Sequence, residues 1–285
     1  MKFDNVYFIN GTAYAGKSTM VKLLAARHGG IACEENYHNA WLDRLDPKEF
    51  PGLCYTRDLK DWRHFIRRTP DEYEAWINTT SKECAAIELQ MLEEIAAHGK
   101  PVFVDTNIPP EILHRVSDKA HVLIMLAEPQ ISVNRFFDRP DREKQFLYRL
   151  LTEEDDPKAA MENFRACLSR INSKEAYESF MNCGFKVLVR DDRRSVKETL
   201  VLAEHALGLP VDMMVLEEAV ACIKEMETLF DRLSTVPDRE GLAILTEYYE
   251  GGKWQYHYHL DELGLLPADL KRGVLSEDGV YNLLT

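Results

Sequence analysis

Short apolar runs alternate with longer amphipathic segments along the first 210 residues of the chain. Each run holds three to five residues, mostly β-branched or aromatic. Runs of this kind are typical of parallel strands that are buried on both faces, and their alternation with helices indicates βαβ units. We therefore predict an α/β fold with a five-stranded parallel sheet. The predicted strands cover residues 6–9, 31–33, 102–104, 122–126 and 186–189.

Two well-defined helices are predicted between these strands. Residues 17–28 place apolar side chains at helical spacing and end at the glycine pair 29–30. Residues 81–97 form a second, longer helix. The intervening segment 37–80 has a mixed, largely helical pattern, and its position predicts a flap over the acceptor side of a binding site.

A change of charge marks the C-terminal quarter of the chain. Residues 211–285 carry 15 acidic and 6 basic side chains, a net charge of −9, whereas residues 1–210 carry a net charge of −4. The change coincides with a Gly-Leu-Pro sequence at 208–210. Glycine and proline punctuate chains at domain boundaries, so we predict one domain over 1–210 and a second over 211–285.

The second domain is predicted to be small and helical. Apolar residues at three- and four-residue steps predict helices over 213–233 and 239–250, and an N-capped final turn or two follows Ser276. The pair His257-x-His259 raises the question of a metal site. Its aromatic neighbours favour a strand-like alternation instead.

Composition narrows the class of protein. With 285 residues, 45% hydrophobic and 29% charged, the chain resembles an ordinary soluble globular protein. Its longest apolar stretch, residues 122–127, is far shorter than the ~20 residues that span a bilayer, so no membrane partner is expected. A net charge of −13 disfavours binding to nucleic acid. The six scattered cysteines contain no C-x-x-C pair and predict reduced thiols in the cytoplasm.

A phosphate-binding motif follows the first predicted strand. The sequence GTAYAGKST at 11–19 matches G-x-x-x-x-G-K-[ST], the Walker A motif, at every fixed position and precedes a predicted helix. Backbone N–H groups of such a loop surround phosphate oxygens, while the lysine neutralises charge and the serine hydroxyl ligates Mg²⁺. The motif predicts a nucleoside triphosphate, ATP, with Mg²⁺. Its residues are Gly11, Thr12, Ala13, Tyr14, Ala15, Gly16, Lys17, Ser18 and Thr19.

The motif and its context resemble the P-loop nucleotide and small-molecule kinases. The sequence I-N-G-x-x-x-A-G-K-S at 9–18 is most similar to the group of chloramphenicol phosphotransferase and shikimate, gluconate and adenylate kinases, and the resemblance covers about residues 3–207. It implies a P-loop NTPase three-layer sandwich and an ATP-dependent kinase. No guanine-specific N-K-x-D sequence is present. Tyr14 departs from the glycine that many of these kinases have, and its ring is a candidate lining of the acceptor pocket.

The resemblance also assigns acidic residues at two strand ends. Glu35, with Glu34 beside it, follows the second strand and is the candidate general base, although a solvated acidic turn is the alternative. His38 is either a further acceptor contact or a surface residue. Asp105 follows the strand that resembles Walker B and is the candidate Mg²⁺-shell residue, with a helix or turn cap as the alternative.

Arginine-rich segments complete the predicted kinase site. In the resembled kinases the segment after the fourth strand is a lid, and this implies that Arg139 and Arg142, with Arg135 nearby, act on the transferring phosphate. A solvated helix face is the alternative. The predicted flap contains four more arginines among aromatic residues. This pattern indicates either recognition of an acidic or phosphorylated acceptor or a hydrophobic core formed by the aromatic residues. These arginines are Arg57, Arg63, Arg67 and Arg68.

Residues 239–285, with the helix before them, resemble a small bacterial domain family of unknown function. This resemblance implies no chemistry and leaves binding of a protein partner as one role for the domain.

Two functions follow from the sequence. The first is an Mg²⁺-ATP-dependent phosphotransferase acting on a small hydroxylated or phosphorylated molecule. The second is a regulatory ATPase or switch, in which the C-terminal domain responds to the bound nucleotide.

Overall fold

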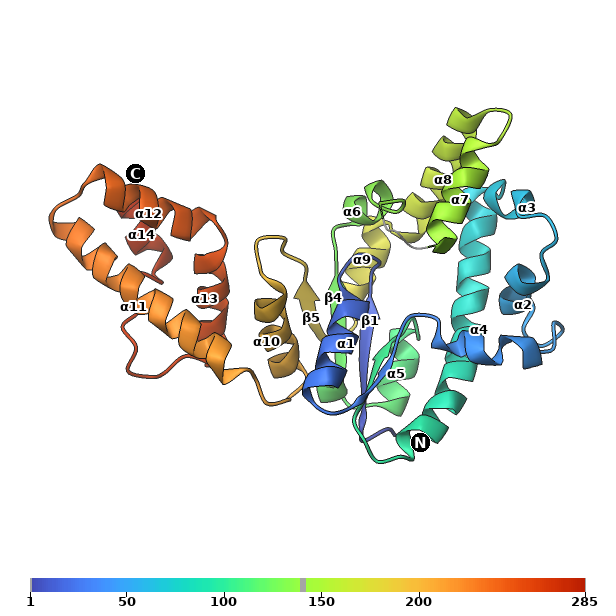
Figure 1. Cartoon of the computed structure of the whole chain (residues 1–285), viewed down its shortest axis with the longest axis horizontal. Coiled ribbons are helices and arrows are strands. Elements are labelled where there is room, and N and C mark those ends of the chain that lie inside the picture. Colours follow the sequence, from blue (N-terminus) through green and yellow to red (C-terminus); the bar gives the residue numbers. More distant parts are fainter. Residues whose placement is uncertain (1, 139–141, 285) are drawn as a thin grey trace. The chain divides into compact units, whose positions relative to one another are not determined.

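The computed structural model describes residues 2–138 and 142–284 of the chain (Figure 1). The chain divides into two compact units. The first comprises residues 1–190 and 206–208, and the second comprises residues 191–205 and 209–285. The division therefore begins earlier in the chain than the predicted boundary at 208–210.

The first unit is built on a five-stranded parallel sheet, as the apolar runs predicted. Its strand order is β2-β3-β1-β4-β5, so the first strand lies at the centre. All side chains of β3 and β4 are buried, which explains their uninterrupted apolar sequences. The strands are β1 (Val6–Gly11), β2 (Ile31–Cys33), β3 (Val102–Asp105), β4 (Val122–Leu126) and β5 (Lys186–Val189).

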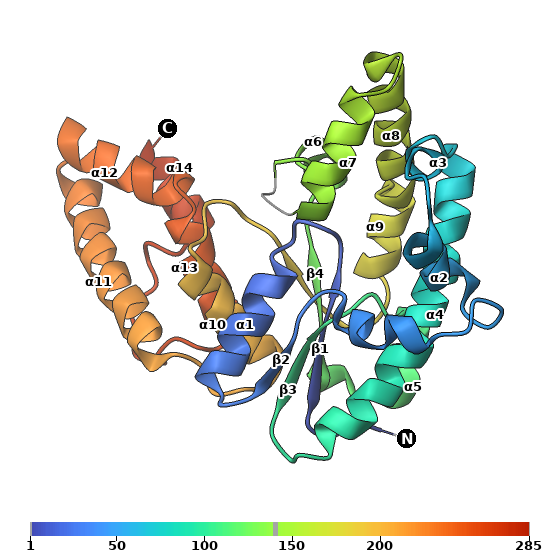
Figure 2. The same ribbon diagram turned by 45° about the vertical axis from the view of Figure 1, so that its right-hand side comes forward.

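Helices cover both faces of this sheet. These helices are α1 (Lys17–Arg27), α4 (Pro70–Ala96), α5 (Pro110–Val116) and α9 (Lys174–Met181). The first helix lies against one face, and α4, α5 and α9 lie against the opposite face (Figure 2). On that opposite face Phe8, Val104 and Ile124 from the sheet pack with Leu92 and Leu113 from two of the helices in one buried cluster.

The register of the sheet brings two predicted site segments together. Ile9 of β1 pairs with Asp105 of β3, and Gly11 pairs with Met125 of β4. Because all the strands are parallel, their carboxyl ends lie at one edge, where ligands bind in open α/β sheets. The loop after β1 and the carboxylate that ends β3 are therefore neighbours.

Helix α4 extends well beyond the sheet and begins eleven residues before the predicted start at Ser81. That prediction was wrong at its N-terminal end. Thr69 and Glu72 form a capping box, and Pro70 occupies the first turn. The early half of α4 packs against α8 around Tyr73 and Phe164. The remaining elements of the first unit are η1 (Tyr37–Arg44), α2 (Pro51–Asp58), α3 (Arg63–Ile66), η2 (Lys119–His121), α6 (Pro129–Asn134), α7 (Arg142–Thr152) and α8 (Pro157–Ile171).

The second unit is helical, as predicted. Its buried Glu227 accepts hydrogen bonds from the backbone N–H groups of Gly273 and Val274, and the Trp254 indole donates to the Val274 carbonyl over 2.8 Å. These bonds fix the loop that precedes the last helix. The helices are α10 (Val196–Ala206, all but its last residue), α11 (Met213–Thr235), α12 (Arg239–Glu250), α13 (Lys253–Glu262) and α14 (Glu277–Leu284).

The strand-like alternation predicted around His257 is wrong, because this segment is the helix α13. The His257 ring contacts the Tyr248 hydroxyl over 3.0 Å, and burial lowers the pKa of His257 to about 4. The ring is therefore neutral at neutral pH and shares one hydrogen bond with the tyrosine hydroxyl. Two residues apart on a helix, His257 and His259 point in different directions and do not converge on an ion. Across the described residues, no helix has the length and apolarity needed to cross a bilayer.

Candidate functional site

The 11–19 loop connects β1 to α1 and requires glycine at two positions. Gly11 has φ +124°, and a Cβ atom there would lie 1.9 Å from the Met125 carbonyl oxygen. Gly16 has φ +94° and is the N-cap of α1, so no side chain covers the first turn. The N–H groups at the start of α1 therefore face the loop, an arrangement that favours anions.

Side-chain bonds hold this loop against the ends of neighbouring elements. The Thr12 hydroxyl accepts a hydrogen bond from the Ala127 N–H over 2.7 Å, and the Ser132 hydroxyl donates to the Ala13 carbonyl over 2.9 Å. Lys17 Nζ lies 3.2 Å from the Thr12 carbonyl oxygen. The lysine ammonium is thus held close to the backbone of the loop.

Tyr14 adopts a conformation that is unusual for a residue with a side chain. Its φ is +65°, in the left-handed region, and its side chain is buried. The phenol donates a hydrogen bond to the Arg135 carbonyl, just beyond α6. The ring is therefore directed to the segment that follows α6, and Tyr14 is not among the residues that line the cleft described below.

Asp105 lies beside the loop and is 3% exposed. The Ser18 hydroxyl donates to Asp105 Oδ2 over 2.6 Å, and Lys17 Nζ lies 3.8 Å from Oδ1. Oδ1 is buried and accepts no hydrogen bond from any described residue. Burial raises the pKa of Asp105, although Lys17 and Ser18 act in the opposite direction. A cation close to Oδ1 would satisfy this carboxylate.

Three predicted site segments meet in an open cleft of about 470 Å³. Ser18 from α1, Glu35 from the end of β2 and Arg142 from the start of α7 line the same space. Glu35 also contributes to the raised pKa of Asp105, so its charge acts at the metal-shell candidate. Arg139 lies outside the described residues. The cleft lining is Ser18, Glu34, Glu35, Asn36, Asn39, Arg142 and Glu143.

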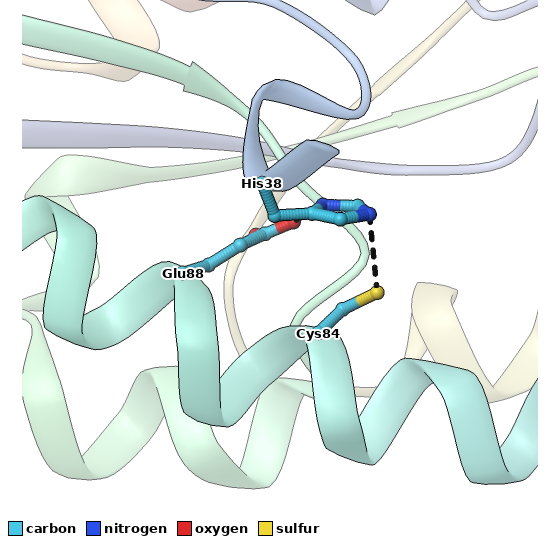
Figure 3. A group of neighbouring side chains, drawn as sticks. All are labelled: His38, Cys84 and Glu88. Atoms are coloured by element: carbon cyan, nitrogen blue, oxygen red, sulfur yellow. Dashed lines mark hydrogen bonds and ion pairs between the residues drawn. The ribbon is translucent and has the colours of Figure 1, made fainter. Parts of the chain in front are cut away.

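His38 does not reach this cleft. It is buried, and its ring faces α4, where Nδ1 lies 2.9 Å from Glu88 Oε1 (Figure 3). Glu88 Oε2 accepts a hydrogen bond from the Thr106 hydroxyl over 2.7 Å. Sequence reasoning missed Glu88, although a signal exists, because this acid stands among the apolar residues Ala85 and Leu92 on the buried side of the helix.

The arginines of the predicted flap are engaged within the fold. Arg57 is paired with Asp58 and with backbone carbonyls, and Arg67 donates to Glu154 over 2.8 Å. The Arg68 guanidinium lies 4.0 Å from the centre of the Tyr55 ring. The aromatic residues here belong to a core, as one of the two alternatives predicted, and recognition of an acidic acceptor by these arginines stays a prediction.

The pKa of Asp105 leads to a testable prediction about stability. A carboxyl whose folded-state pKa is raised stabilises the fold fully below its unfolded pKa, and that contribution is lost as pH rises through the folded value. Asp105→Asn should therefore raise the melting temperature of the nucleotide-free protein at pH 7, and the gain should vanish near pH 4. Thermal unfolding from about pH 4 to pH 8 measures this difference.

Asp118→Asn serves as the matched control. Lys2 lowers the pKa of exposed Asp118, so its loss should act in the opposite direction and only weakly. If Asp105→Asn were less stable than the unsubstituted protein at pH 7, the buried carboxylate would be a structural group and not a strained functional one.

Comparison with known proteins bears on the C-terminal unit. A family model described as "Domain of unknown function (DUF4298)" matches residues 213–285. The predicted resemblance of this segment to a family of unknown function is confirmed. Neither a curated protein nor a solved structure matches the chain.

Proposed function

We propose that the chain is an Mg²⁺-ATP-dependent phosphotransferase that acts on a small polar molecule, either hydroxylated or phosphorylated. One observation supports this above the others. Ser18, which is bonded to the buried Asp105, opens into the same cleft as Glu35 and Arg142. A residue of the proposed ATP site, a candidate general base and a candidate cation therefore line one cleft.

The donor side of the proposal rests on the 11–19 loop. The uncapped first turn of α1 and the Lys17 ammonium provide N–H groups and positive charge for the β- and γ-phosphates. The absence of an N-K-x-D sequence favours ATP over GTP. Lys17 would exchange its bonds to loop carbonyls for stronger, charge-assisted bonds to phosphate oxygens.

The residues present fit Mg²⁺. The Ser18 hydroxyl and the Asp105 carboxylate are oxygen donors of the kind Mg²⁺ prefers, and buried Oδ1 of Asp105 has no hydrogen bond from the described residues. Ser18 would hold the ion and Asp105 would order its water shell. When bound, the ion would neutralise charge on the donor phosphates.

The acceptor side of the proposal rests on Glu35 and Arg142. The Glu35 carboxylate takes the proton of the acceptor hydroxyl. As it does so, the acceptor oxygen forms a bond to the γ-phosphorus of ATP, and the bond from that phosphorus to the leaving ADP oxygen breaks. Arg142 stabilises charge on the phosphoryl group in transit. The cleft lining is polar, with carboxylates, amides and a hydroxyl, which favours an acceptor rich in hydroxyl groups.

A regulatory ATPase or switch is the second candidate. It is favoured by the C-terminal unit, which matches a separate family and carries an apolar groove between α11 and residues 265–267. Such a groove suits a protein partner better than a small polar substrate. In this alternative, nucleotide hydrolysis would proceed without an acceptor.

Thermal unfolding with nucleotides tests the proposal. Mg²⁺-ATP at about 100-fold above its Kd should raise the melting temperature by roughly 5 to 10 °C, because a ligand that binds only the native state stabilises it by mass action. ATP with excess chelator should give a smaller shift. The absence of any shift with ATP, GTP or their Mg²⁺ complexes would contradict both candidate functions.

A second measurement separates the two candidates. ADP release is followed with Mg²⁺-ATP alone and then with a panel of small hydroxylated and phosphorylated compounds. Stimulation by one class of compound supports the phosphotransferase. Turnover that no compound changes supports the switch.

A further inference from the structure

Three side chains outside the cleft converge in the first unit. Cys84 and Glu88 lie one turn apart on the same side of α4, and His38 approaches them from η1 (Figure 3). One nitrogen, one sulfur and one oxygen atom from these residues all lie within 4.8 Å of one another. None of the three residues lines the cleft described above.

The hydrogen bonds of this cluster have defined directions. The Glu88 carboxylate only accepts, so His38 Nδ1 and the Thr106 hydroxyl both donate to it. The remaining ring nitrogen of His38, Nε2, faces Cys84 Sγ at 3.6 Å. Glu88 therefore fixes the tautomer and the orientation of the imidazole, with its second nitrogen directed at a thiol.

The separation of Nε2 and Sγ is suited to a metal ion. Zinc binds imidazole nitrogen at about 2.0–2.1 Å and thiolate sulfur at about 2.3 Å, so two such ligands at a tetrahedral angle are about 3.5 Å apart. The observed 3.6 Å matches this separation without movement of either side chain. A carboxylate on the other ring nitrogen is the usual outer partner of a zinc-bound histidine.

From this geometry we infer that His38 and Cys84, with Glu88 behind the imidazole, form a binding site for a thiophilic divalent cation of the Zn²⁺ class. On binding, the sulfur–metal bond forms as the thiol proton leaves to solvent, and no oxidation or reduction takes place. Sulfur and imidazole ligands select Zn²⁺ over Mg²⁺ or Ca²⁺, so the site is separate from the proposed Mg²⁺ site at Ser18.

The burial of the cluster suits such an ion. The side chains of His38 and Glu88 are 7% and 4% exposed, whereas Cys84 is only half-buried. Two protein ligands leave two positions of a tetrahedral site, which water or an added ligand would fill. Asn36 and Asn39, on either side of His38 in the chain, line the cleft. The bound ion would therefore hold η1, which forms one wall of the cleft, against α4.

Cobalt provides a spectroscopic test on the full chain without nucleotide. After treatment with a chelator, the protein is titrated with Co²⁺ up to about 1 mM, a probe that occupies Zn²⁺ sites. A sulfur-to-cobalt charge-transfer band in the near ultraviolet is expected, with visible bands that Zn²⁺ then removes by displacement. Zn²⁺ should also raise the melting temperature.

Matched variants assign the bands to this cluster. Cys84→Ser should lose the charge-transfer band, whereas Cys222→Ser, which changes a half-buried cysteine of α11, should keep it. Glu88→Gln should weaken the affinity for Co²⁺ about tenfold to a hundredfold. The inference is overturned if the unsubstituted protein shows no thiolate band, or if folded Cys84→Ser retains it. Neither result depends on nucleotide binding, so a failure here is distinct from a failure of the phosphotransferase proposal.

Discussion

Replacement of Lys17 by alanine should lower the affinity for Mg²⁺-ATP about a hundredfold, which corresponds to ~2.7 kcal/mol. The Lys17 ammonium lies over the loop, 3.2 Å from one of its carbonyl oxygens, and would donate charge-assisted hydrogen bonds to the β- and γ-phosphates. Each such bond contributes about 1.5–3 kcal/mol. Isothermal calorimetry of both proteins with Mg²⁺-ATP measures the loss directly.

Lys22→Ala is the matched control for this experiment. Lys22 is on the same helix, and its ammonium forms an exposed ion pair with Glu34 over 2.9 Å. Surface pairs contribute little, so the affinity for Mg²⁺-ATP should change by less than about fivefold. Equal affinity in the Lys17 variant and the unsubstituted protein would rule out the 11–19 loop as the nucleotide site. The melting temperature of each variant shows whether the fold is intact.

All five strands could be predicted from sequence, most clearly β3 and β4, whose side chains are all buried. Burial removes the polar positions, and the remaining apolar runs are conspicuous in a chain with 29% charged residues. Parallel pairing then places strand ends at one edge. The contact between the 11–19 loop and Asp105 also requires that β3 pair directly with β1, a strand order that the sequence did not predict.

The helices that were mispredicted depend on tertiary packing. Residues 253–262 alternate aromatic and polar side chains, which indicates a strand, but the chain buries Trp254, His257 and Leu260 at three-residue steps. Tyr258, which a strand would bury with Trp254, is 38% exposed. The early half of α4 was missed for a similar reason, because it packs against α8 through residues such as Tyr73 and Phe164, which are far apart in the chain. Local propensity carries no information about such partners.

The candidate site was predictable only in part. Ser18, Glu35 and Arg142 line the same cleft because each lies beyond the carboxyl end of a parallel strand. Ser18 follows β1, Glu35 follows β2, and Arg142 comes after β4 and α6. The direction of His38 was not predictable, since it depends on the turn at Asn36, which has φ +64°. That turn carries the imidazole into the core toward Glu88, 50 residues later in the chain.

Glu35→Gln should lower the turnover number of the proposed phosphotransferase by about a hundredfold or more, with little change in the affinity for ATP. A general base contributes about 10²- to 10⁴-fold by removing a proton in the transition state, and glutamine keeps the shape of the side chain without accepting that proton. Glu35 lies just after β2 and lines the same cleft as Ser18. The kcat and KM values for both substrates are measured once the acceptor panel has identified a substrate.

Glu34→Gln provides the comparison that makes this test specific. Both acids line the cleft, but the charge of Glu35 contributes to the raised pKa of Asp105, whereas Glu34 is paired with Lys22 on the rim. A proton acceptor must lie close to the reacting oxygen, so only the Glu35 variant should lose turnover strongly. Equal losses in the two variants would mean that the acidic turn binds the acceptor through its combined charge. Unchanged turnover in both variants would show that neither Glu34 nor Glu35 is the general base, and would favour the regulatory ATPase.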